Sequence, residues 1–133
     1  MSKTILIQDP DALIRLDLAQ TVLESWPDAH VILCHNAFQI LTLLADGQDP
    51  DMVIVRQSLR SARAAGLADL VQNPRVKVLL TGADDDEALM IAAAGWRALD
   101  MPFSATQVRA ALRDACPEPD LRAQSHCNAI GLG

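Results

Sequence analysis

Polar side chains that directly follow short apolar runs are the residues best placed for chemistry in this sequence. Asp9 and Asp11 follow the first run, Arg56 follows the third and Thr81 follows the fourth. Carboxylates can hold a hard cation such as Mg²⁺, a hydroxyl can contact an anionic group, and a guanidinium can pair with a carboxylate. These side chains meet only if the runs are neighbouring parallel strands, whose carboxyl ends share one edge of a sheet.

The arrangement of apolar residues predicts such a sheet. Short, largely apolar runs, typical of buried strands, occupy 4–7, 30–34, 52–55 and 76–80, with a weaker run at 96–100. Helical periodicity separates them over 13–25, 38–44, 61–71, 89–94 and 108–115. In the first helix, the apolar residues taken to recur at helical spacing are Leu13, Leu16, Ala19, Val22 and Leu23. Five strands alternating with five helices predict an α/β fold with a doubly wound parallel sheet and right-handed crossovers.

Composition indicates the class of protein. The chain has 133 residues, of which 50% are hydrophobic and 21% charged, as expected for one globular domain. Its net charge of -6 disfavours nonspecific nucleic-acid binding, and no apolar run approaches the ~20 residues of a membrane span. Three widely spaced cysteines argue against a disulfide framework and for a cytoplasmic location. We expect one domain over 1–115 and a flexible C-terminal tail over 116–133.

Four segments in the expected order resemble the receiver domain of bacterial response regulators, over roughly residues 3–115. They are Ile5–Arg15, Pro50–Val55, Leu79–Gly82, and the pair Ala94-Gly95 with Met101-Pro102-Phe103. The resemblance implies a CheY-like, flavodoxin-like (βα)5 fold with strand order 2-1-3-4-5. It also implies the family's chemistry, in which an aspartate ending the third strand accepts a phosphoryl group. In that family an acidic pair holds Mg²⁺, and a hydroxyl residue and a lysine contact the phosphoryl oxygens.

This chain departs from the family at most of those positions. The phosphoacceptor position is Arg56, which has no oxygen to attack phosphorus or to bind Mg²⁺. The acidic pair keeps Asp9, but its neighbour is Pro10, and the lysine position is Met101. Only the hydroxyl residue, Thr81, is retained. We therefore expect a pseudo-receiver with no catalytic residue, no metal and no cofactor, and we expect that it is not an enzyme.

These losses suggest a replacement for the metal. Arg56 carries a permanent positive charge, so we hypothesise that it pairs with Asp9, and also with Asp11 or Asp100 at neighbouring strand ends. A second cation at residue 101 would be repelled, and Met101 avoids that repulsion. The alternative is a register difference of one residue, which would turn Arg56 to the other face of its strand.

Each of the other candidate residues has a plain structural explanation. Asp9 and Asp11 can form a turn and a helix cap, and Thr81 can be a strand-end residue with a satisfied hydroxyl. Ser58 is expected in a turn. The acidic run Asp84 to Glu87 is best explained by compensation of a helix dipole.

The expected function is phosphorylation-independent protein binding in signal transduction, with a histidine kinase or another signalling protein as partner. In receivers, a surface formed by the fourth helix, fifth strand and fifth helix often mediates dimers, so a homodimer is a second possibility. That surface would draw on Leu89, Ala93, Trp96, Arg97, Val108 and Arg109, with Trp96 or Arg97 as contact residues if exposed. Two other classes stay open: a sensor of a small anionic ligand held by Arg56 and Thr81, and a phosphoacceptor that uses an unrecognised residue.

Overall fold

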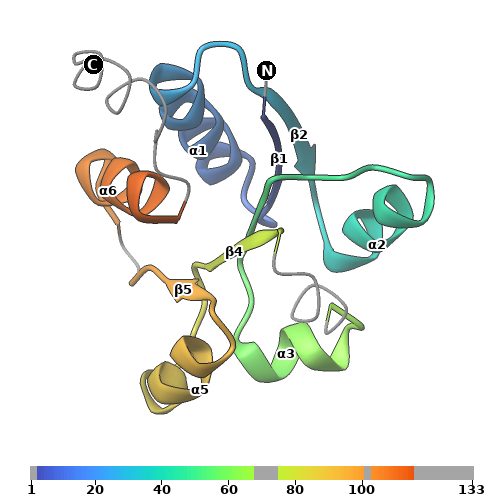
Figure 1. Ribbon diagram of the computed structural model, residues 1–133, viewed down its shortest axis with the longest axis vertical. Helices are drawn as coiled ribbons and strands as arrows, with labels where there is room; N and C mark the ends of the chain where they lie inside the picture. Colours follow the sequence, from blue (N-terminus) through green and yellow to red (C-terminus); the bar gives the residue numbers. More distant parts are fainter. Residues whose placement is uncertain (1–2, 68–74, 101–102, 116–133) are drawn as a thin grey trace, which may run out of the picture.

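Five parallel strands form one sheet in the order β2-β1-β3-β4-β5 (Figure 1), which confirms the expected fold class. The computed structural model describes residues 3–67, 75–100 and 103–115. The strands are β1 (Thr4–Gln8), β2 (His30–Cys34), β3 (Met52–Val55), β4 (Lys77–Leu80) and β5 (Arg97–Ala98). The central strands β1, β3 and β4 are almost wholly buried, as their unbroken apolar sequences require.

Helices cover both faces of the sheet. They are α1 (Ala12–Ser25), α2 (Ala37–Ala45), α3 (Leu59–Ala64), α5 (Ala88–Ala93) and α6 (Ala105–Ala115), with the 3-10 turn η1 (Asp85–Glu87) leading into α5. Helices α1 and α6 pack side by side on one face, and α2, α3 and α5 lie on the other (Figure 1). This is the doubly wound arrangement that the alternating pattern predicts.

Side-chain caps fix where several helices begin. A carboxylate oxygen of Asp11 accepts from the amide of Leu13 at 2.9 Å, so its expected role as a helix cap is confirmed. The Ser58 hydroxyl accepts from the amide of Ser61 at 3.0 Å. Because Ser58 is a cap, α3 starts at Leu59, two residues before the position that apolar periodicity indicated.

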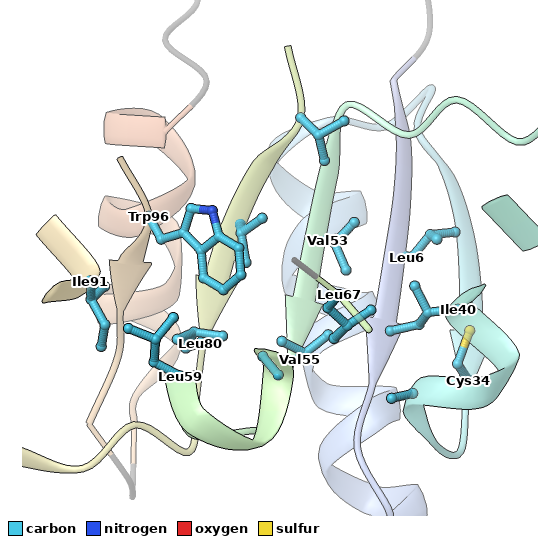
Figure 2. Close-up of a cluster of buried hydrophobic side chains, with 14 residues drawn as sticks. Leu6, Cys34, Ile40, Val53, Val55, Leu59, Leu67, Leu80, Ile91 and Trp96 are labelled. Carbon is cyan, nitrogen blue, oxygen red and sulfur yellow. The ribbon is translucent and has the colours of Figure 1, made fainter. Parts of the chain in front are cut away.

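The sheet separates two apolar clusters, because successive strand side chains point to opposite faces. Leu6 and Val53 lie in the cluster under α2, α3 and α5, together with Trp96 (Figure 2). Ile7 and Ile54, one position further along the same strands, lie in the cluster under α1 and α6. One-residue alternation therefore distributes a nearly continuous apolar sequence over two cores.

Several sequence-based expectations are corrected here. Leu13 and Leu16 are exposed, because the side of α1 that meets the sheet carries Leu18 and Val22 instead. The fifth strand shrinks to two residues, since it pairs with β4 only at Arg97 and Ala98. The predicted helix over 61–71 ends at Ala64, and its last residues lie outside the described residues. The expected tail, 116–133, also lies outside them.

No helix in the described part of the chain is both long and apolar enough to cross a membrane.

Candidate functional site at the carboxyl edge of the sheet

Three of the residues singled out from the sequence come together where β1, β3 and β4 end. Asp9 follows β1, Arg56 follows β3 and Thr81 follows β4. A cavity of about 510 Å³ opens at this edge and is lined by Arg56, Thr81, Gly82, Ala83, Asp85 and Asp100. Parallel strands in this order bring these ends together, so the position of the site follows from the topology.

Asp9 is a fully buried carboxylate with a partner on each oxygen. One oxygen accepts from the amide of Asp11 at 2.8 Å, and the other lies 3.3 Å from Nη1 of Arg56. The guanidinium of Arg15 donates to the main-chain carbonyl of Asp9. Both expected roles therefore hold, because one carboxylate forms a turn with one oxygen and an ion pair with the other.

The Arg56 side chain points into the site and does not lie on the opposite face of its strand. Its side chain is 36% exposed and pairs with Asp9 at 3.3 Å, so the hypothesised ion pair between these two residues is confirmed and the register alternative is wrong. Pairing with Asp11 or Asp100 is not observed among the described residues. The guanidinium covers the buried carboxylate and leaves part of its surface toward the cavity.

Gln8 holds the site together, a role that sequence analysis did not assign to this strand-end residue. Its main-chain oxygen and Oε1 both accept from the amide of Arg56, at 3.1 and 3.2 Å. Its Nε2 donates to the carbonyl of His35 at 3.0 Å. The buried amide thus joins the ends of three adjacent strands, β2, β1 and β3. A polar residue ending an otherwise apolar strand was the available signal.

Thr81 matches its plain structural explanation. It is buried, and its hydroxyl donates to the carbonyl of Val55 at 3.3 Å. Gly82 beside it is needed for close packing, because a Cβ there would lie 3.0 Å from the amide nitrogen of Gln57. Pro10 is exposed and has no ligand atom, and Met101 lies outside the described residues.

The residues present do not fit the Mg²⁺ ion that receivers bind. A divalent cation needs several oxygen ligands, and in the described chain Asp9 is the one buried carboxylate that follows β1, while the buried Glu87 is held by the amides of Leu59 and Arg60. Nη1 of Arg56 lies 3.3 Å from a carboxylate oxygen of Asp9. The negative charge of Asp9 is therefore already paired with a cationic side chain of the same protein. The Asp11 carboxylate is turned to the start of α1.

A second buried carboxylate, Glu87, lies where the acidic run 84–87 meets α3. Its oxygens accept from the amides of Leu59 at 2.8 Å, Arg60 at 3.0 Å and Asp84 at 3.2 Å. Glu87 therefore caps a helix from another part of the chain. The helix-dipole compensation expected for residues 84–87 therefore explains only part of their role, because Glu87 also caps α3.

Opposing effects act on the ionisation of Glu87. Burial favours the neutral acid, but the hydrogen bonds from three amides and the charge of Arg60 favour the carboxylate, and the pKa lies below its ordinary value of 4.5. Arg60 also pairs with Asp84 at 3.3 Å and Asp86 at 2.8 Å, and these acids raise the pKa of its guanidinium. This network ties the β4–α5 connection to the start of α3, next to the site.

The expected interaction surface is brought together only in part. A groove of about 450 Å³ runs between α5, β5 and α6, and Trp96 and Arg97 are among its lining residues. Trp96 is only 5% exposed, so it is a core residue that forms a wall of the groove and not a protruding contact. Leu89 and Ala93 are exposed on α5 outside the groove lining.

Val108 and Arg109 do not line this groove. Val108 is 1% exposed and packs in the cluster beneath α1. Arg109 pairs with Glu24 of α1 at 3.7 Å. The physical reason is helical periodicity: the positions of α6 that line the groove are Gln107, Ala110, Ala111 and Asp114, and residues 108 and 109 face α1.

Solved structures of known proteins share this fold over most of their length. A pilus assembly protein (CpaE) of Burkholderia thailandensis has 25% identity and a TM-score of 0.68, and the match covers 89% of this chain and 100% of that chain. A pilus assembly-related protein of Burkholderia pseudomallei has 23% identity and a TM-score of 0.64, over 85% and 88%. The chemotaxis response regulator CheY4 of Vibrio cholerae has 16% identity and a TM-score of 0.62, over 86% and 99%.

No protein-family model and no curated protein matches the sequence. Receiver domains from several other response regulators match with TM-scores of 0.61 to 0.65. The strand order and these neighbours lead to one conclusion: the chain has the fold of response regulator receiver domains.

Proposed function

We propose that this protein is a pseudo-receiver that acts by phosphorylation-independent binding of a partner protein. The observation that carries the proposal is the ion pair between Arg56 and the buried Asp9, at 3.3 Å. At the position where receivers have the phosphoacceptor, this side chain offers nitrogen donors and no nucleophile. We further propose that the chain is not an enzyme.

The ion pair also suggests how the domain works without a metal. Receivers change state when charge is added to the carboxylate site. Here the negative charge of the buried Asp9 is paired with the permanent positive charge of Arg56, so the site has one fixed electrostatic state. We propose that the partner therefore recognises a single constant conformation.

The groove between α5, β5 and α6 is the surface that we propose for the partner. Small apolar side chains, Ala92, Ala110 and Ala111, line it together with the edge of Trp96. Arg97 and Asp114 lie 3.9 Å apart at the groove and offer charged contacts of both signs. Small residues flanked by charges suit a helix or loop of another signalling protein. A second copy of this chain is the other possible occupant.

Two of the structural neighbours support a role in binding. The Burkholderia proteins are described by their roles in pilus assembly, and one has the highest identity among the proteins compared above. A shared fold with proteins named for pilus assembly agrees with the proposed function.

The other two function classes have less support. An anionic ligand in the cavity would approach Asp85 and Asp100 as well as Arg56, and the Thr81 hydroxyl already donates to Val55. Among the described residues, Ser58 is the hydroxyl residue closest in sequence to Arg56, and it caps α3. Neither arrangement favours an anion sensor or a substitute phosphoacceptor.

The test is exposure of the full chain to acetyl phosphate and Mg²⁺, followed by intact mass measurement. We expect no phosphoryl adduct on the unaltered chain. The matched control carries Pro10→Asp and Arg56→Asp, which restores the acidic pair and an acceptor carboxylate. A stoichiometric phosphoryl adduct on the unaltered chain would overturn the proposal.

The binding surface is tested by capture of partners from the native cell. We expect Arg97→Glu to lose the captured partner and Arg63→Glu to retain it, since Arg63 is exposed on α3 away from the groove. Equal capture by both variants would place the partner on another surface.

A further inference from the structure

Helix α1 exposes leucines on the side that faces away from the sheet. Leu13 is 73% exposed, Leu16 is 57% exposed and Leu23 is 40% exposed, whereas Leu18 and Val22 of the same helix are buried. Exposed large apolar residues that share one helix face are a mark of an interaction site. This surface is separate from the groove between α5, β5 and α6, so its function goes beyond the one proposed above.

The spacing of these residues is that of a coiled-coil seam. Leu13, Leu16, Gln20 and Leu23 are separated by three, four and three residues, which is the a-d-a-d pattern of two heptads. A seam of this kind packs against another seam of the same spacing, and a second copy of this chain supplies one. We infer that α1 pairs in parallel with α1 of a second copy.

The polar seam residue favours the parallel direction. In a parallel pair each seam residue meets its own equivalent, so the amide of Gln20 meets the amide of Gln20 in the second copy. Each amide has a donor and an acceptor, and the two can satisfy each other. In an antiparallel pair Gln20 would face Leu16 and lose that partner.

The flanking charges favour the same direction. Asp17 and Glu24 lie on one flank of the seam, and Ala12 and Ala19 lie on the other. Parallel helices bring one flank opposite the other, so each acid faces an alanine. Antiparallel helices would bring acid opposite acid. Glu24 is also neutralised within its own domain by Arg109, 3.7 Å away.

The size of the seam sets the strength of the dimer. A helix of 14 residues is about 21 Å long, and three leucines per copy bury much less than the ~800 Å² per partner of a standard stable interface. Each copy also carries a net charge of -6. The dimer is therefore weak, forms at high protein concentration, and becomes tighter with added salt as repulsion is screened.

Sedimentation equilibrium of the full chain tests the inference. We expect the dissociation constant of the dimer to rise at least tenfold with Leu16→Lys, to fall with Gln20→Leu, and to fall with added salt. The matched control is Leu89→Lys, the same change at an exposed leucine of α5 outside the seam, which leaves the constant unchanged. Circular dichroism confirms that each variant is folded.

Cross-linking tests the direction of the pair. With Cys116 and Cys127 changed to serine and Cys34 buried, a Gln20→Cys variant forms a disulfide-linked dimer in a parallel pair. A chain that stays monomeric, or a dimer that Leu89→Lys weakens and Leu16→Lys does not, overturns the inference. A dimer that cross-links only between Leu13→Cys and Leu23→Cys copies overturns its parallel direction.

Discussion

At the scale of single residues, the site is decided by a buried carboxylate that needs a counter-charge. Asp9 is fully buried, and a buried charge is costly unless it is paired and hydrogen-bonded. The chain supplies both, through Arg56 and the amide of Asp11. Arg56 therefore stabilises the fold by matching the charge of the buried Asp9.

Arg56→Ala is expected to lower the free energy of unfolding by about 1–2 kcal/mol, because it leaves Asp9 without its counter-charge while water reaches the half-open site. Urea denaturation measures the change. Arg63→Ala, which removes an exposed arginine of α3, is the control and costs much less. Adding Asp9→Asn to Arg56→Ala should recover part of the loss, and a double variant no better than the sum of the single variants would contradict the pairing.

At the scale of elements, short helices are held by contacts from outside themselves. Helix α3 has six residues, and its first amides are capped by Glu87 from the β4–α5 connection as well as by Ser58. An isolated helix of that length is unstable in water, so tertiary contacts account for its presence. The same contacts fix the loop that carries Arg56.

Glu87→Gln is expected to destabilise the domain in a pH-dependent way. The folded-state pKa of Glu87 is lowered, so its contribution is complete above its ordinary value of 4.5 and is lost as pH falls through the lowered pKa. Urea midpoints should therefore differ between the variant and the parent at neutral pH and converge in acid. Asp85→Asn removes an exposed carboxylate two residues away and should leave the midpoint unchanged at every pH. A constant difference for Glu87→Gln across pH would contradict this explanation.

The end of α5 depends on one glycine. Gly95 has φ 78°, and the amide of Trp96 bonds to the carbonyl of Ile91 at 3.1 Å. Gly95→Ala should cost about 1–2 kcal/mol, because a Cβ is unfavourable in the left-handed region. Gly95→Asn should cost less. Thermal melts measure both, and equal losses for the two variants would show that φ is not the cause.

At the scale of the whole molecule, two cores on opposite faces of one sheet explain which surface residues are free. Trp96 fills the core under α2, α3 and α5, and Val108 fills the core under α1. Val108 is therefore not available as a surface contact, and Trp96 offers only the part of its ring that lines the groove. The apolar residues that remain exposed are therefore better guides to binding than apolar residues in general.

Trp96→Ala is expected to lower the free energy of unfolding by about 3–5 kcal/mol, as for other large-to-small core changes. Arg97→Ala, its exposed neighbour, should change it by less than about 0.5 kcal/mol. Chemical denaturation of the two variants compares them directly. A stable Trp96→Ala variant that loses partner binding would instead make this tryptophan a contact residue.

From the sequence alone, the alternation of apolar strands with helices predicted a doubly wound parallel sheet, and the resemblance to receivers implied its strand order. The sequence also determined the charge at the end of the third strand, since Arg56 carries a permanent positive charge. Strand ends that meet at one edge made the pairing with Asp9 predictable.

Only the tertiary structure decided which polar groups face each other across elements. Glu87 caps α3 and Gln8 joins three strands through contacts between residues 27 to 48 positions apart in the chain. The spacing of residues within one helix or strand does not show which residues so far apart in the chain will be in contact. Periodicity likewise identified α1 as a helix but not its buried side, because Leu13, Leu16 and Leu23 satisfy the same spacing rule as the residues that the sheet buries.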